Sequence, residues 1–127
     1  MAIGIEQALD QARSLRRSGD TAGADALAGE IARIAAARIA SGQAPAAEAL
    51  LAAVREITPL NPDALLYSGV CRQTAGEFAE AEELIRRSLT LAPGRADAWT
   101  NLGAVQIAQG KTVPAIESFR KAIAINP

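Results

Sequence analysis

Scarce residues recur along this chain at intervals of 34, and this period constrains the fold more than any other feature of the sequence. Three prolines, three glycines and three alanines keep the spacing: Pro59, Pro93 and Pro127; Gly42, Gly76 and Gly110; Ala47, Ala81 and Ala115. Two looser columns follow it as well: Ala35, Gly69 and Gly103; Ile57, Leu91 and Ile125. A period between about 20 and 50 residues indicates stacked copies of one supersecondary unit.

Each copy carries the signals of two helices. Asn61 is a good helix cap, Pro62 fits a first helical turn, and Asp63 suits the positive end of the helix dipole. The helix that they start is expected to run to about residue 75, because Gly76 can adopt the left-handed conformation that ends a helix. A second helix over about 78–91 is stopped by Pro93. The next copy predicts helices near 96–109 and 112–125, so the unit is a helical hairpin.

The first 27 residues do not keep the period. Ala8, Ala12 and Leu15 form an apolar stripe on a predicted helix over about 4–18. A second stripe continues without a clear break to residues 41–42, which favours one long helix over 21–40; the alternative is a break near Gly29. The chain is then a single domain, residues 1–127, with an N-terminal capping segment over 1–27 and repeats over 28–61, 62–95 and 96–127.

The last unit resembles the tetratricopeptide repeat. Its residues Trp99, Leu102, Gly103, Ala115, Phe119 and Pro127 match the repeat pattern, and only the expected tyrosine is replaced, by Gln106. The resemblance covers about residues 28–127, with looser matches in the two earlier units. It implies an all-α fold, a right-handed superhelical solenoid of antiparallel helix hairpins with about seven helices.

The repeat pattern also predicts how the helices pack. Gly69 with Ala81, and Gly103 with Ala115, would let the two helices of a hairpin approach closely. Trp99 and Phe119 are expected to fill the space between hairpins, with Trp99 largely buried.

Composition and charge exclude several kinds of function. The chain has no His and one Cys, so its inventory excludes a zinc site, a Ser-His or Cys-His nucleophile pair and an internal disulfide. Its 13 basic and 14 acidic residues nearly cancel in both halves, which disfavours nucleic-acid or membrane partners. We expect no enzyme activity, cofactor or metal in these residues. The start lacks the basic and apolar regions of a targeting segment, which predicts a cytoplasmic location.

Two other candidate sites have plainer structural explanations. Acidic residues cluster at the start of a predicted helix, at Glu77, Glu80, Glu82 and Glu83. They suit the helix dipole, and Glu82 with Arg86 and Glu83 with Arg87 have the favourable i,i+4 order. Cys71 lies inside a helix beside small residues and is expected to be a core residue rather than a reactive thiol.

The resemblance implies that the first helix of each hairpin lines a concave groove that binds a peptide or a helix. The groove residues would be Arg33, Asp63, Leu66, Tyr67, Val70, Gln73, Asp97, Thr100, Asn101 and Ala104, beside less distinctive positions such as Ala32, Ala36, Ile39, Thr74 and Ile107. Related co-chaperones hold an acidic C-terminal tail with Lys, Asn and Arg, but here the matching positions are Ala32, Ala36, Tyr67, Asp97 and Asn101. Arg33 alone would offer positive charge, which disfavours that specialisation. Asn101 fits one rung of the asparagine ladder found in O-linked N-acetylglucosamine transferase, but Tyr67 and Arg33 occupy the equivalent slots of the other units.

Three functions remain open. The first is a scaffold that binds a protein or peptide partner in the groove. The second is the substrate-recognition region of a larger bacterial enzyme, such as a protein glycosyltransferase or sulfotransferase. The third is a self-associating module. Apolar residues of the predicted last helix cannot all face inward, so we expect the chain to be the N-terminal part of a longer protein or to pair with another chain through its C-terminal hairpin.

Overall fold

The computed structural model describes residues 4–127, and within them the chain forms seven α-helices and no strand. The helices are α1 (Ile5–Arg17), α2 (Thr21–Ala40), α3 (Ala44–Ile57), α4 (Pro62–Thr74), α5 (Phe78–Leu91), α6 (Ala96–Ala108) and α7 (Thr112–Ile125). The all-α prediction is confirmed, with helix ends within a residue or two of those expected. Residues 1–3 of the predicted capping segment lie outside the described residues.

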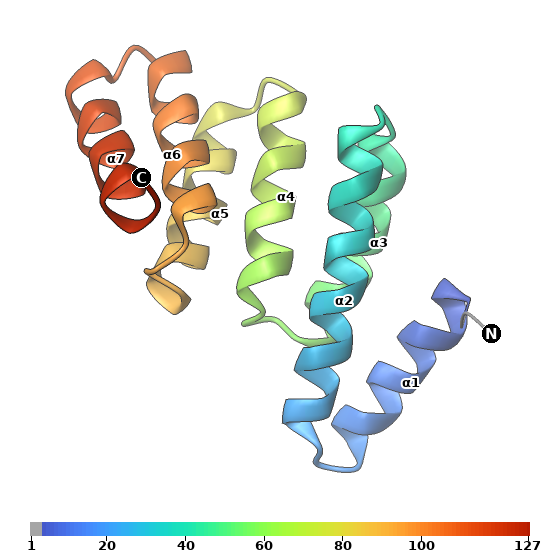
Figure 1. Ribbon diagram of the computed structural model, residues 1–127. Coiled ribbons are helices and arrows are strands. Elements are labelled where there is room, and N and C mark those ends of the chain that lie inside the picture. The colour runs from blue at the N-terminus through green and yellow to red at the C-terminus, as the bar shows by residue number, and fades with distance from the viewer. Residues whose placement is uncertain (1–3) are drawn as a thin grey trace.

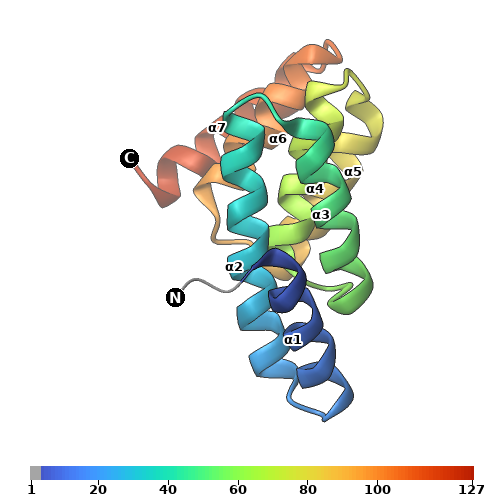
Figure 2. The ribbon, with the colours of Figure 1, turned by 90° about the vertical axis from the view of Figure 1, so that its right-hand side faces the viewer.

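Successive helices pack as antiparallel hairpins that stack in chain order (Figure 1). Helices α2 and α3, α4 and α5, and α6 and α7 form the three hairpins, and α1 packs on α2 and α3. Helix α4 also contacts both α2 and α6, so these three helices form one layer. Helices α3 and α5 lie on the other side of the array, with α1 beneath α3 (Figure 2). The predicted solenoid of helical hairpins is therefore confirmed.

The predicted start and stop signals work as expected in the middle unit. The Asn61 side chain accepts a hydrogen bond from the backbone N–H of Ala64 at 3.1 Å and so caps α4. Gly76 follows that helix with a φ of +81°, a conformation that costs a side-chain-bearing residue more. Glycines in the same slot of the other units have the same conformation, which explains why this column keeps the period: Gly42 and Gly110.

Helix α2 is continuous over 20 residues, and the alternative break near Gly29 does not occur. Gly29 lies where α4 approaches α2: a Cβ built on it would stand 3.2 Å from the Asp63 carboxylate. The glycine therefore makes room for a neighbour rather than ending the helix.

The small residues allow close approach inside the hairpins, as predicted. A Cβ on Gly69 would lie 2.7 Å from the Ile85 side chain. A Cβ on Gly103 would lie 2.6 Å from the Phe119 ring. This second contact corrects one expectation, because Phe119 packs against Gly103 within its own hairpin instead of filling the space between hairpins.

Two clusters of apolar side chains form the core. The first joins α1, α2, α3 and α4, and includes the buried Cys71. Burial raises the pKa of the Cys71 thiol, as expected for a core residue. The second joins α4, α5 and α6, and Trp99 packs against it. Trp99 is not fully buried, because beside it Arg86, Leu89 and Thr90 of α5 border an open hollow. The prediction that Trp99 is largely buried therefore holds for most of the side chain, which packs on the second cluster, while the side that borders the hollow stays open.

Candidate partner-binding face

The surface formed by α2, α4 and α6, called the inner face below, carries most of the predicted groove residues. Arg33, Asp97 and Thr100 are exposed on it. A half-buried set fills the space between them: Asp63, Tyr67, Val70, Gln73, Asn101 and Ala104. Leu66 is fully buried in the second core cluster and offers a partner no surface.

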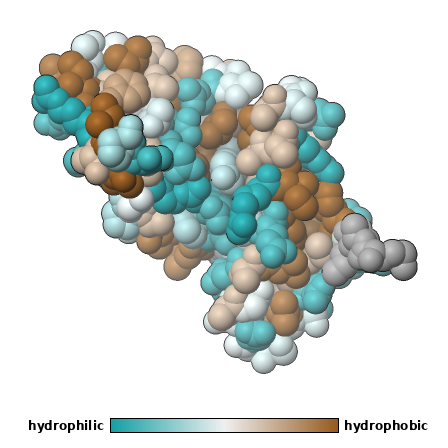
Figure 3. All heavy atoms as spheres, viewed as in Figure 1, coloured by the Kyte–Doolittle hydropathy of each residue, from teal (hydrophilic) through white to brown (hydrophobic). Residues whose placement is uncertain are grey.

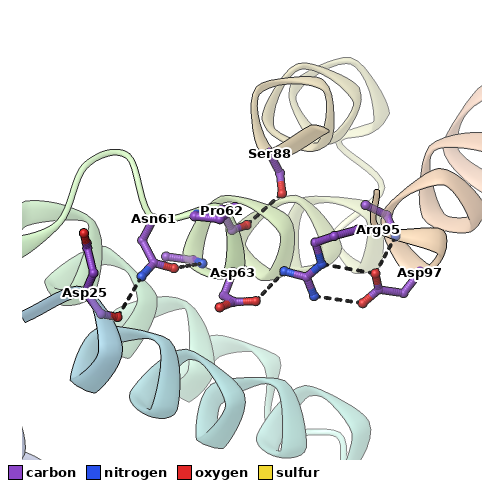
Figure 4. Close-up of polar contacts among 9 residues, drawn as sticks. Asp25, Asn61, Pro62, Asp63, Ser88, Arg95 and Asp97 are labelled. Atoms are coloured by element: carbon purple, nitrogen blue, oxygen red, sulfur yellow. Dashed lines mark hydrogen bonds and ion pairs between the residues drawn. The ribbon is translucent and has the colours of Figure 1, made fainter. Parts of the chain in front are cut away.

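Arg95 organises the charges of the inner face (Figure 4). It precedes α6, and its guanidinium pairs with Asp63 of α4 and with Asp97 of α6. Two of its bonds reach the Asp97 carboxylate, from Nε to Oδ1 at 3.2 Å and from Nη2 to Oδ2 at 2.9 Å. Burial alone would lower the pKa of Arg95, but Asp97 and Asp63 outweigh it and raise that pKa. Because two carboxylates already hold it, this cation has little capacity left for a partner's charge.

The sequence interpretation missed Arg95. It named Arg33 as the only groove cation, whereas the Arg95 guanidinium lies 6.0 Å from the Tyr67 ring centroid, among the predicted residues. A signal existed, since Arg95 stands 34 residues after Asn61 and both precede the first helix of a unit.

Polar bonds fix the start of α4 between its neighbours (Figure 4). The Asn61 side-chain amide donates to the backbone oxygen of Asp25 in α2 at 3.3 Å. The Ser88 hydroxyl of α5 donates to the backbone oxygen of Pro62 at 2.7 Å. These bonds hold α4, and with it Asp63 and Tyr67, in a defined position relative to α2 and α5.

A hollow of about 430 Å³ lies where α6 meets the end of α7. It brings together three predicted groove residues, Asp97, Thr100 and Asn101. Helix α7 contributes Ala122 and Ile123 to its wall, neither of which the sequence interpretation included. Figure 3 shows this side of the molecule, with hydrophilic residues gathered over its middle and hydrophobic ones toward both ends of the array.

Within the acidic cluster at the start of α5, Glu82 has a structural role. Oε2 of Glu82 accepts from Arg86, and Oε1 accepts from Gln109 at 2.7 Å and from Lys111 at 2.9 Å. Burial alone would raise the pKa of Glu82, but the hydrogen bonds from Lys111, Gln109 and Arg86 outweigh it and lower that pKa to about 2. The expected pairing of Glu83 with Arg87 does not occur among the ion pairs of residues 4–127.

Neither metal-ligand clusters nor membrane-spanning helices occur in the described part of the chain. Its His, Cys, Asp and Glu residues form no group of three or more that could hold a metal ion. None of the helices α1 to α7 is both long and apolar enough to cross a bilayer.

Solved structures with the same arrangement of helices show a shared fold. A MamA mutant superposes with a TM-score of 0.67 at 19% identity, covering 98% of this chain and 99% of that chain. The first TPR of Spaghetti (RPAP3), bound to HSP90 peptide SRMEEVD, gives 0.71 at 18% identity over 79% of each chain. The second TPR of the same protein, bound to the same peptide, gives 0.71 at 14% identity over 78% of this chain and 92% of that chain.

Sequence comparison with family models identifies the repeats directly. A comparison with curated proteins gives no match. Two models of the tetratricopeptide repeat match, one over residues 38–89 and the other over residues 96–127. Together they cover about two thirds of the chain and fall on the hairpins built from α3 to α7. The chain belongs to the tetratricopeptide repeat family.

Proposed function

We propose that this chain is a protein-interaction module whose inner face binds a segment of a partner protein. The observation that carries the proposal is the row of half-buried side chains on rigid, adjacent helices, with Tyr67 and Val70 on α4 and Asn101 and Ala104 on α6. Half-buried side chains on fixed helices can be covered by a partner at small cost in conformational entropy. Two proteins of the same fold hold a peptide, which supports this use of the fold.

The chemistry of the inner face favours a segment with apolar and uncharged side chains. Arg95 is already held by Asp63 and Asp97, so it offers little to a partner's carboxylates. Tyr67 and Val70 provide apolar contact area. Asn101 borders the hollow beside α7, where its amide can both donate to and accept from a peptide backbone.

A displayed library of short random peptides tests this proposal without a known partner. Peptides selected on the wild-type chain should bind the double variant Tyr67→Ala with Asn101→Ala about tenfold more weakly or worse, as for loss of two central contacts. The matched control is Glu83→Ala with Thr90→Ala, two exposed residues of α5. Its binding should stay within about twofold of wild type.

Two outcomes would contradict the proposal. One is unchanged binding in a folded groove variant, with helicity and melting measured by circular dichroism. The other is a selection that yields mainly Glu- and Asp-rich peptides whose binding depends on Tyr67 and Asn101. If the double variant does not fold, Asn101→Arg replaces it. The Asn101 side chain is half-buried and borders the hollow, so an arginine there can extend into the hollow and block it.

Self-association is a second candidate, which the surface of α7 favours. Val113 and Ile123 expose 72% and 62% of their surfaces. One repeat earlier, Leu89 occupies the slot of Ile123 and is buried. On α5 this surface is covered by the following hairpin. On α7 the same surface is exposed. A second copy of the chain could cover it through a two-fold contact, in which the same patch meets itself.

A further inference from the structure

Three neighbouring hollows lie in a row on the side of the array away from the inner face. The first is lined by Arg55, Pro59 and Arg87, and also by Glu56. The second shares Glu56 and adds the end of α1. The third shares Arg87 and adds Leu60 and Leu91. The shared residues place these hollows side by side, from the last turn of α1, past the end of α3, to the end of α5.

The charge along this row of hollows is positive. Five arginines line it, and we call them the outer arginine strip: Arg13, Arg16, Arg17, Arg55 and Arg87. Glu56 is the single carboxylate that borders the same hollows. The chain as a whole has a net charge of -1, so the strip departs from the balanced composition.

These arginines differ from the ones between the repeats. Arg72 and Arg95 pair with carboxylates of neighbouring helices. Arg86 pairs with Glu82, whose other oxygen bonds to donors of the next unit. In the strip, Arg13 pairs with Asp10 of its own helix. The other four take part in none of the ion pairs found among residues 4–127. Arg16, Arg17 and Arg87 are exposed and Arg55 is half-buried, so these guanidinium groups line the hollows without a carboxylate of the described residues bound to them.

Apolar side chains accompany this charge. Leu60 exposes 69% of its surface and Leu91 exposes 43%. Both line the hollow that continues from Arg87. A surface that combines guanidinium groups with exposed leucines fits a ligand with both carboxylates and apolar side chains.

We propose that the outer arginine strip is a second interaction surface, which binds an acidic segment of a partner protein that carries spaced apolar side chains. The carboxylates of this segment bind to the guanidinium groups of Arg16, Arg17, Arg55 and Arg87. A planar guanidinium can donate two parallel hydrogen bonds to one carboxylate. The apolar side chains of the segment cover Leu60 and Leu91. This surface is separate from the inner face, so one chain can hold two segments at once.

Fluorescence anisotropy with synthetic peptides tests the proposal. The probe is a labelled peptide of alternating Glu and Leu, and two companions replace Leu by Ser or Glu by Lys. Charge reversal in Arg55→Glu with Arg87→Glu should raise the Kd for the Glu-Leu peptide about tenfold or more. The matched control, Arg120→Glu with Lys121→Glu, changes the net charge equally at exposed positions outside the strip and should change that Kd by less than about twofold.

The companion peptides separate charge from apolar contact. The Glu-Ser peptide should bind more weakly than the Glu-Leu peptide, and the Lys-Leu peptide should not bind. The inner-face variant Tyr67→Ala with Asn101→Ala should bind the Glu-Leu peptide like wild type. The proposals for the two surfaces can therefore be contradicted independently.

Several results would overturn the proposal. One is an equal loss of Glu-Leu peptide binding in the strip variant and in its control. A second is unchanged binding of this peptide in the strip variant. Another is binding of a single-stranded oligonucleotide or of anionic phospholipid vesicles, but not of the Glu-Leu peptide, that depends on Arg55 and Arg87. If the first variant does not fold, Arg16→Gln with Arg17→Gln tests the other end of the strip with the same peptides.

Discussion

At the scale of single residues, Gly103 illustrates how one missing side chain sets the distance between two helices. A Cβ there would lie 2.6–2.8 Å from three atoms of the Phe119 ring. We expect Gly103→Ala to lower the free energy of unfolding by about 1–3 kcal/mol, because α7 must move or the ring must leave its place. Denaturant unfolding measures this change.

Gly94→Ala is the matched control for that substitution. No atom lies within 4 Å of a Cβ built on Gly94. Its effect should stay within about 0.5 kcal/mol, as for most surface changes. Equal effects of the two substitutions would contradict the assignment of Gly103 as a packing position.

Glu82 gives the chain a defined dependence on pH. Its pKa is about 2 in the fold, against an ordinary value of 4.5. The unfolded chain therefore binds the proton more readily, and the stability due to Glu82 is present above about pH 4.5 and is lost as the pH falls toward 2. Glu82→Gln should lower the free energy of unfolding at neutral pH by about 1–2 kcal/mol, since its partners Arg86 and Lys111 are about half exposed.

The pH series distinguishes this role from simple loss of a contact. Between about pH 6 and pH 3, the stability of wild type should fall more steeply than that of Glu82→Gln. Parallel slopes in the two proteins would show that Glu82 does not titrate as described.

Residue types alone could not reveal which side chains satisfy one another. Gln106 replaces the expected tyrosine of the repeat, and the sequence gives no reason for the change. In the structure its buried amide lies 2.7 Å from the Ser118 hydroxyl of α7, so the polar substitution has a partner across the hairpin. Arg95 was missed for a similar reason, because its partners come from two different helices.

At the scale of elements, helix ends were predictable and side-chain exposure was less so. Caps, prolines and left-handed glycines act within a few residues of the helix end, so they can be read locally. The exposure of Leu66 or Trp99 depends on how α5 and α6 approach α4, which the repeat pattern gives only on average. The sequence thus predicted the helices that form the inner face better than the residues available on it.

Asn61 links the start of one helix to another helix. Asn61→Ala would remove both the cap of α4 and the bond to the Asp25 backbone oxygen. We expect the free energy of unfolding to fall by about 1–2 kcal/mol, the combined effect of a lost cap and an unsatisfied buried group.

The control is Asn126→Ala, which changes the exposed residue that ends α7. Thermal unfolding should show a clear shift for Asn61→Ala and almost none for Asn126→Ala. A comparable shift in both variants would contradict the linking role of Asn61.

At the scale of the whole molecule, the open surface of α7 makes a prediction about assembly. Ile116→Lys with Ile123→Lys should shift the chain toward monomer in sedimentation velocity if copies meet through α7, because buried lysines would repel one another across a two-fold contact. Ile34→Lys with Leu60→Lys changes two other exposed apolar residues and should leave the distribution unchanged. A wild-type chain that is monomeric at high concentration would contradict self-association through α7.

The glutamates that connect successive hairpins also determine the order in which the three units can follow one another along the chain. Glu48 and Glu82 occupy the same slot of the first two units, and each bonds to donors of the unit that follows. In the third unit that slot holds Ile116. Placing the third unit before the second would set Arg72 against an isoleucine and leave its guanidinium without that partner. The three hairpins are therefore alike in shape but not interchangeable, and a permuted gene would encode a less stable protein from the same parts.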